Sequence, residues 1–134
     1  MSQENVETAR RCVDALNRRD IDGYLACCTD DVELRTALVA LEGAHNGAEG
    51  IRRFFADIQD TAPDFRLEFE RIETVGLDRV LGFERGTASG RSSGVALDGG
   101  IPFGTVYDFV DGKISRVRVF TDRAEALEAA GLSE

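Results

Sequence analysis

Three side chains in this sequence combine a reactive group with a position near the expected apolar interior: Arg85, Asp108 and His45. Arg85 follows Leu81 and Phe83 at alternate positions of a predicted strand, so these side chains are expected on one face. A buried guanidinium needs a partner, either a protein carboxylate or an anionic or carbonyl-bearing ligand. We therefore predict that Arg85 stabilises negative charge on a ligand. The alternative is an arginine at the open end of the sheet, paired with a surface glutamate.

Asp108 and His45 are the candidates for moving a proton. Alternation from Tyr107 directs Asp108 outward, whereas a β-bulge near Gly104 would turn it towards the interior. There, desolvation would raise the pKa of Asp108 and make it a general base. His45 is the only histidine and lies in a predicted loop, residues 37–46, near the mouth of the expected cavity. The alternative for both residues is a surface position without a catalytic role.

A long hairpin at residues 101–122 must be the centre of the sheet that positions these side chains. Asp111 and Gly112 suit the positive φ angles of a tight turn, and the flanking apolar residues alternate. A hairpin this apolar is expected to bury one face. Alternation also predicts strands at 32–36, 65–75 and 81–87, with a bulge near Arg71.

The remaining segments are predicted to be helical. Apolar residues at helical spacing indicate helices over 2–18 and 48–60. Asp20 is expected to cap a second, short helix, and a D-x-x-E pattern that begins at Asp122 precedes a closing helix over 124–130. Helices segregated from a mainly antiparallel sheet define the α+β class. We predict one domain, residues 1–134, in which a cone-shaped, strongly curved sheet wraps over three helices and encloses an apolar cavity.

The composition excludes several classes of partner. The 134 residues include 25 acidic and 16 basic side chains, a formal charge of −9, which repels nucleic acids and anionic membranes. No apolar run is long enough to cross a bilayer, and the first residues lack the apolar core of a signal peptide. Cys12, Cys27 and Cys28 are predicted to be buried, reduced thiols in the cytoplasm. Without metal-ligand spacing or a nucleotide motif, we expect no metal and no other cofactor.

Three stretches resemble the nuclear-transport-factor-2-like superfamily, in particular its SnoaL-like and ketosteroid-isomerase-like members. They are ETARRCVDALNRRDIDGYLACCTDDVEL, GAEGIRRFFADI and VYDFVDGKISRVRVFTDRAEALEAAGL, which together with their surroundings cover nearly the whole chain. The resemblance implies a cystatin-like fold. It implies no single activity, because the family includes ketosteroid isomerases, polyketide cyclases, epoxide hydrolases and non-catalytic modules.

The resemblance also predicts which catalytic groups this chain has lost. The tyrosine, base and late-strand acid of ketosteroid isomerases correspond to Cys12, Thr36 and a position near Val106, none of which keeps the required chemistry. Of the Asp-Arg-Asp set of limonene-epoxide-hydrolase-like members, only the arginine remains, as Arg85. The two aspartate positions correspond to Thr87 and Val119, and the water-holding positions to Leu34 and Thr36. Neither classical reaction is expected by these routes.

What remains is an apolar cavity with few polar groups, which is typical of small-molecule pockets. The predicted ligand-binding residues are Leu34, Thr36, Phe54, Phe55, Ile58, Phe83, Thr87, Phe103, Tyr107, Val117 and Val119. The first hypothesis is a pocket protein that binds or transforms a small apolar, oxygenated molecule. If it is an enzyme, isomerase-, cyclase- or hydrolase-type acid–base chemistry would use Arg85 for charge and Asp108 or His45 for the proton.

The second hypothesis is a non-catalytic module that has lost the family's catalytic carboxylates. In this case the cavity is only core, or binds without reacting. The outer face of the sheet is predicted to carry Val106, Val110 and Phe120, which is unusual for a monomer. We therefore expect a homodimer, with no nucleic acid or membrane partner under either hypothesis.

Overall fold

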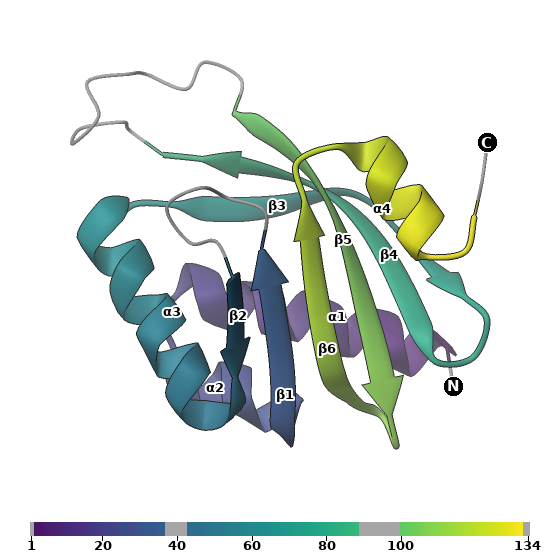
Figure 1. Ribbon diagram of the computed structural model, residues 1–134, viewed down its shortest axis with the longest axis horizontal. Helices are drawn as coiled ribbons and strands as arrows, with labels where there is room; N and C mark the ends of the chain where they lie inside the picture. The colour runs from purple at the N-terminus through teal and green to yellow at the C-terminus, as the bar shows by residue number, and fades with distance from the viewer. Residues whose placement is uncertain (1, 37–42, 89–99, 133–134) are drawn as a thin grey trace.

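The computed structural model describes residues 2–36, 43–88 and 100–132 (Figure 1). Its helices are α1 (Ser2–Asn17), α2 (Ile21–Ala26), α3 (Gly47–Thr61) and α4 (Arg123–Ala129). Its strands are β1 (Cys28–Thr36), β2 (Gly43–Asn46), β3 (Arg66–Val75), β4 (Arg79–Thr87), β5 (Ile101–Val110) and β6 (Lys113–Phe120). The long helices predicted from apolar spacing are therefore confirmed to within a residue or two at each end.

The strands form one curved sheet in the order β2-β1-β6-β5-β4-β3. Only the β1–β6 pair is parallel among the described strands, and all the other neighbours are antiparallel. Helices α1, α2 and α3 cover the inner face of the sheet, while α4 lies on the outer face (Figure 1). This arrangement confirms the predicted α+β class.

Local chemistry explains several of the element boundaries. Asp111 and Gly112 adopt φ angles of 53° and 80°, as expected for the β5–β6 turn. The backbone N–H of Gly23 donates to Asp20 Oδ1 over 2.9 Å, which caps α2. The pairing of β3 with β4 shifts register between Phe69 and Arg71, so the bulge predicted there is confirmed.

The apolar residues form two cores, one on each face of the sheet. The larger core lies between the inner face and helices α1 to α3, and includes Leu16, Phe55 and Tyr107. The smaller one lies under α4 and includes Leu81 and Val106. No helix among the described residues is long and apolar enough to span a membrane.

The structure differs from two expectations, one about the outer face of the sheet and one about residues 43–46. Val106 is fully buried beneath α4 and Phe120 is half-buried, so only Val110 of the predicted outer apolar group is exposed, at 53%. The closing helix covers this face because Gly104 lets it approach closely. Residues 43–46, predicted as loop, form strand β2 paired with β1. The sequence GRSSG at residues 90–94, which is typical of a flexible connection, and residues 95–99, where extended structure is predicted to resume, lie outside the described residues.

Candidate functional site

A buried carboxyl group, Glu84 on β4, is the most unusual side chain of the inner core. Its exposed fraction is 0%. The hydroxyl of Thr105 donates to its Oε1 over 2.5 Å, and the hydroxyl of Tyr107 donates to its Oε2. Both donors lie on β5, the strand that pairs with β4. The carboxyl group is therefore held in one orientation by two hydroxyls of the neighbouring strand.

Two glycines explain why Glu84 faces inward. Gly82 and Gly86 share its face of β4, and a Cβ atom at either position would lie 2.6 Å from an aromatic carbon, of Phe69 and Phe103 respectively. The rings of neighbouring strands occupy the space above the glycines, so this glycine-rich face is the buried one. Hydrophobicity alone predicts that the more apolar opposite face, with Leu81 and Phe83, points inward. That face lies instead under α4.

The electrostatics of Glu84 are dominated by its burial. Loss of solvation raises its pKa from 4.5 to about 7, against the opposing effects of the Thr105 and Tyr107 hydrogen bonds and the charge of Arg123. Arg123 approaches from the outer face, where its Nη2 donates to the backbone carbonyl of Glu84 over 2.8 Å. Near neutral pH both protonation states of Glu84 are populated, which is the condition for a group that accepts and returns a proton.

Glu84 lines a small internal cavity of about 40 Å³ between the sheet and α1 to α3. Its lining residues are Cys12, Val13, Leu16, Tyr24, Leu34, Phe54, Leu67, Glu84, Thr105, Tyr107, Val117 and Val119. Burial raises the pKa of Tyr24 and of Cys12 well above their ordinary values, so the phenol and the thiol stay protonated. The cavity therefore combines one acid with hydrogen-bond donors in an otherwise apolar wall.

The structure brings only some of the predicted ligand-binding residues together. Those that line the cavity are Leu34, Phe54, Tyr107, Val117 and Val119. Three other predicted residues are buried elsewhere in the core and do not line the cavity: Phe55, Ile58 and Phe103. Thr36 lies beside a separate surface hollow, and Thr87 is exposed. Phe83 packs on the opposite side of the sheet, against the core under α4.

Arg85 lies outside the cavity. Its Nε is 2.6 Å from Glu70 Oε2, and Glu70 also binds Arg123 Nη2 over 2.7 Å. Alternation along β4 places Arg85 on the face opposite Glu84, so the arginine that the sequence analysis directed inward is instead paired with a surface glutamate. This pair corresponds to the alternative stated for Arg85 from the sequence.

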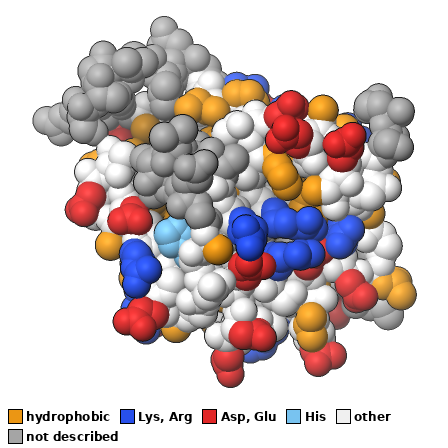
Figure 2. Space-filling model, in the orientation of Figure 1, with side chains coloured by type: hydrophobic (Ala, Val, Ile, Leu, Met, Phe, Trp, Pro, Cys, Tyr) orange, Lys and Arg blue, Asp and Glu red, His pale blue; other side chains and the backbone are white. Residues whose placement is uncertain are grey.

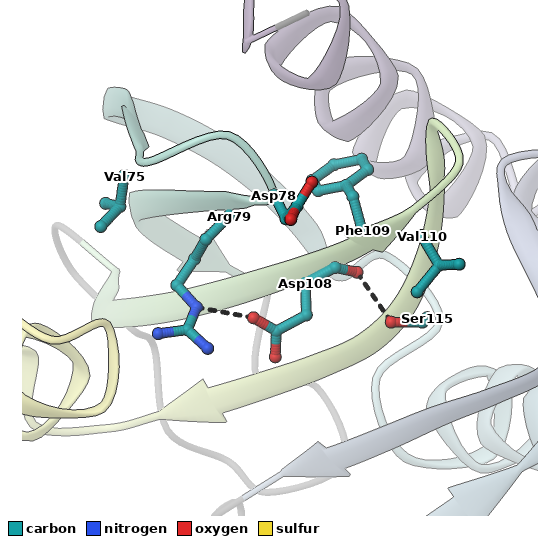
Figure 3. Close-up of a pocket in the computed structure, with 7 residues that line it drawn as sticks. All are labelled: Val75, Asp78, Arg79, Asp108, Phe109, Val110 and Ser115. Atoms are coloured by element: carbon teal, nitrogen blue, oxygen red, sulfur yellow. Dashed lines mark hydrogen bonds and ion pairs between the residues drawn. The ribbon is translucent and has the colours of Figure 1, made fainter.

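Asp108 also lies on the outer face, where its carboxylate and Arg79 point towards each other (Figure 3). Its Oδ1 is 2.6 Å from Arg79 Nε, and its Oδ2 is 2.9 Å from Arg116 Nε and 3.2 Å from Arg118 Nη2. Burial favours the neutral acid, but the three arginines outweigh it and lower the pKa of Asp108. A carboxylate held in this way is a poor general base at neutral pH.

His45 is buried in β2, with an exposed fraction of 8%, and packs against the ring of Phe54 at a centroid distance of 5.7 Å. Its register partner on the neighbouring strand β1 is Leu34. It is therefore next to cavity-lining residues without lining the cavity itself. No group of three or more His, Cys, Asp or Glu side chains suited to a metal ion occurs among the described residues.

Glu84 is the residue that the sequence analysis missed. Its signal was the Gly-x-Glu-x-Gly pattern at residues 82–86 of a strand, because interior strand glycines mark a close approach of neighbouring side chains. A carboxyl group between two such glycines shares their crowded, buried face. Hydrophobicity alone favours the other face of β4, where Leu81 and Phe83 lie.

The curved mixed sheet, with three helices on its concave side and a cavity between, defines a cone-shaped α+β architecture (Figure 1). The SnoaL-like domain family matches residues 9–117. The chain belongs to this family, within the nuclear-transport-factor-2-like superfamily, which confirms the resemblance seen in the sequence.

Solved structures support the same assignment. A cystatin-fold protein from Novosphingobium aromaticivorans is 30% identical with a TM-score of 0.69, over 90% of this chain and 98% of that one. TerC, co-crystallised with polyporic acid, is 24% identical with a TM-score of 0.73, over 96% and 98% of the two chains. An NTF2-like protein of unknown function from Burkholderia pseudomallei is 25% identical with a TM-score of 0.71, over 96% and 97%. A comparison with curated proteins finds no significant match.

Proposed function

We propose that this SnoaL-like protein is an acid–base catalyst that acts on a small apolar, oxygen-bearing molecule, with Glu84 as the proton carrier. The observation that carries the proposal is the buried Glu84 carboxyl group, whose pKa is raised to about 7, in the wall of an apolar cavity. It is the only carboxylic acid among the described residues that line this cavity. Strongly perturbed acids in cavities mark functional sites more often than chance.

The proposed reaction is a proton transfer next to a carbonyl group. The Glu84 carboxylate takes a proton from the carbon beside the carbonyl, and the C–H electron pair moves into a new C–C double bond as the carbonyl oxygen gains negative charge. Tyr24, which stays protonated, donates a hydrogen bond to that oxygen. Glu84 then returns its proton to a second carbon of a conjugated enolate, which completes an isomerisation. In a cyclisation, the enolate carbon instead attacks a second carbonyl carbon of the same molecule, the C=O electron pair moves to its oxygen, and Glu84 returns the proton to that oxygen.

Glu84 replaces the residues that the sequence had suggested for this role. Arg85 and Asp108 both face away from the cavity and are engaged by oppositely charged side chains. The predicted acid–base chemistry is therefore assigned to Glu84 in place of Asp108. A ligand with a carbonyl group is proposed because Glu84 has a pKa near 7 and Tyr24 stays protonated. Such an acid and such a hydrogen-bond donor together promote the formation of an enolate.

A second candidate, a non-catalytic binding or dimerising module, is favoured by two other observations. The cavity of about 40 Å³ is far smaller than the roughly 300–1,000 Å³ of ordinary ligand pockets, so a ligand would have to displace side chains. Both oxygens of Glu84 already accept hydrogen bonds inside the protein, as a structural carboxyl group requires. Under this candidate we propose a cytoplasmic homodimer, which light scattering at several protein concentrations would test.

One experiment separates the two candidates. Native mass spectrometry with a panel of steroids, terpenoid epoxides and polyketides identifies ligands that bind. NMR in D₂O then measures whether the protein exchanges protons of the bound ligand for deuterium. The first candidate predicts exchange by the wild type and by the control Glu68→Gln, whose side chain is exposed on β3, but none by Glu84→Gln. Binding without exchange by the wild type would establish the second candidate.

A further inference from the structure

Four arginines form a patch on the outer face of the sheet, remote from Glu84. This arginine patch consists of Arg35 on β1, Arg79 on β4, and Arg116 and Arg118 on β6. Figure 2 shows basic side chains gathered over this part of the sheet, in a chain whose formal charge is −9. Such a concentration of cations against the overall charge of the molecule requires a physical explanation.

Strand pairing forces like charges together in the patch. Arg35 and Arg118 are register partners in the parallel β1–β6 pair. Like charges directly opposite each other on a sheet are destabilising unless a counter-charge compensates them. Arg35 Nε binds Glu33 Oε2 over 3.0 Å, and Arg118 Nη2 binds Asp108 Oδ2 over 3.2 Å. Glu33 and Asp108 are both register partners of Arg116, so they lie two residues along the strands from the Arg35–Arg118 pair. Among the described residues, neither of these two carboxylates pairs with both Arg35 and Arg118.

Hydrogen-bond donors exceed acceptors across the patch. A single carboxylate, Asp108, serves Arg79, Arg116 and Arg118, and each guanidinium carries five N–H donors. Arg79 uses further donors on the carbonyls of Ala129 and Ala130 at the end of α4, whereas Arg118 Nε is buried without an acceptor among the described residues. Burial is the main cause that lowers the pKa of Arg118, and the charges of Arg116 and Arg79 lower it further, against the opposing effect of Asp108.

The patch adjoins a hollow that could hold the body of a ligand. This hollow, of about 260 Å³, is lined by Arg35, Thr36, Arg118, Val119 and Phe120. Both register-paired arginines thus lie at its wall, next to apolar side chains. Guanidinium groups bind the oxygen pairs of carboxylates and phosphates with well-matched planar geometry.

We propose that Arg35 and Arg118 bind an oxoanion, a carboxylate or a phosphate group, whose apolar body occupies the hollow beside Val119 and Phe120. Asp108 then competes with the ligand for Arg118, because its Oδ2 lies 3.2 Å from Arg118 Nη2. This site does not rest on the function proposed for Glu84, because neither Arg35 nor Arg118 lines the Glu84 cavity, although Val119 lines both the cavity and the hollow.

The test is a binding titration by two-dimensional NMR, at constant ionic strength maintained with sodium chloride. Inorganic phosphate and benzoate are the two probes, so that the arms distinguish a phosphate site from a site for an apolar carboxylate. We expect saturable shifts of backbone signals around Arg35 and Arg118 for at least one probe. Arg118→Gln and Arg35→Gln should each weaken its binding about tenfold or more, the loss expected for one charge-assisted hydrogen-bonding partner.

Two further variants make the result decisive. Arg53→Gln removes an exposed arginine of α3 and should leave the affinity unchanged, which controls for net charge. Asp108→Asn removes the competing carboxylate and should increase the affinity for the same probe. Shifts that do not saturate, or equal affinities for Arg118→Gln and the wild type, would overturn the proposal. The proposal would also be overturned if the wild type were a dimer that Arg118→Gln dissociates, because a second copy of the chain would then cover the patch.

Discussion

Replacement of Glu84 by glutamine should remove a specific pH dependence from the stability of the protein. Glutamine has nearly the same shape, can accept a hydrogen bond from one of Thr105 and Tyr107 and donate one to the other, and cannot ionise. Comparison of the two proteins therefore isolates the proton on Glu84, because the remaining titrating groups are common to both.

The sign and size of the effect follow from the raised pKa. In the unfolded chain Glu84 titrates near 4.5, and in the folded protein near 7, so between these values only the folded state holds the proton. The contribution of the Glu84 proton to the free energy of unfolding is fully present below the pKa of the unfolded state, and it is lost as the pH rises through the pKa of the folded state. Each pH unit of that window is worth about 1.4 kcal/mol. Wild type should therefore lose about 3 kcal/mol relative to Glu84→Gln between pH 5 and pH 8.

Urea unfolding followed by circular dichroism provides the assay, at half-unit intervals from pH 5 to pH 8. The quantity to plot is the free energy of unfolding of wild type minus that of Glu84→Gln. Equal m-values for the two proteins would show that the transitions are comparable. If this difference in unfolding free energy stays constant across the range, the pKa of Glu84 is not raised by folding. If the difference increases with pH, folding lowers the pKa of Glu84 instead of raising it.

Further predictions concern the neighbours of this site and the outer face. Tyr107→Phe removes a hydrogen bond that favours the charged form of Glu84, so the midpoint of the same curve should move to higher pH. Gly104→Ala would place a Cβ atom 2.5 Å from that of Ala126 on α4 and should cost about 1–3 kcal/mol in unfolding free energy, partly recovered by adding Ala126→Gly. Asp108→Asn leaves three arginines without their shared carboxylate and should destabilise the protein at pH 7 by about 1–3 kcal/mol. Because the pKa of Asp108 is lowered by folding, that cost should shrink as the pH falls through its folded pKa, in acid-unfolding experiments.

The fold could be predicted because several local signals agreed with one another. Apolar spacing fixed the long helices, and Asp111 with Gly112 fixed the central hairpin. The bulge near Arg71 followed from a slip in the apolar alternation. Strand β2 could not be recognised in the same way, because its four residues, Gly43–Asn46, are too few to show a period.

The site was harder to predict because β4 is buried on both faces. Alternation separates Leu81, Phe83 and Arg85 from Gly82, Glu84 and Gly86, but it does not say which set faces the helices. The choice depends on α4, which covers Leu81 and Phe83 from the outer side, and on aromatic rings that fill the space above the glycines. Both are tertiary features, so hydrophobicity alone assigns the more apolar set to the larger core and gives no sign of the buried acid.

A titration of the Glu84 carboxyl group itself tests most directly whether this residue carries the proton. Selective ¹³C labelling of glutamate side chains allows each carboxyl carbon to be followed by NMR as the pH changes, and the signal missing from Glu84→Gln identifies residue 84. We expect a midpoint near 7 for this signal, with Glu84 about half protonated at neutral pH. A midpoint at or below 4.5, the ordinary value for a glutamate, would contradict the assignment of Glu84 as the proton carrier.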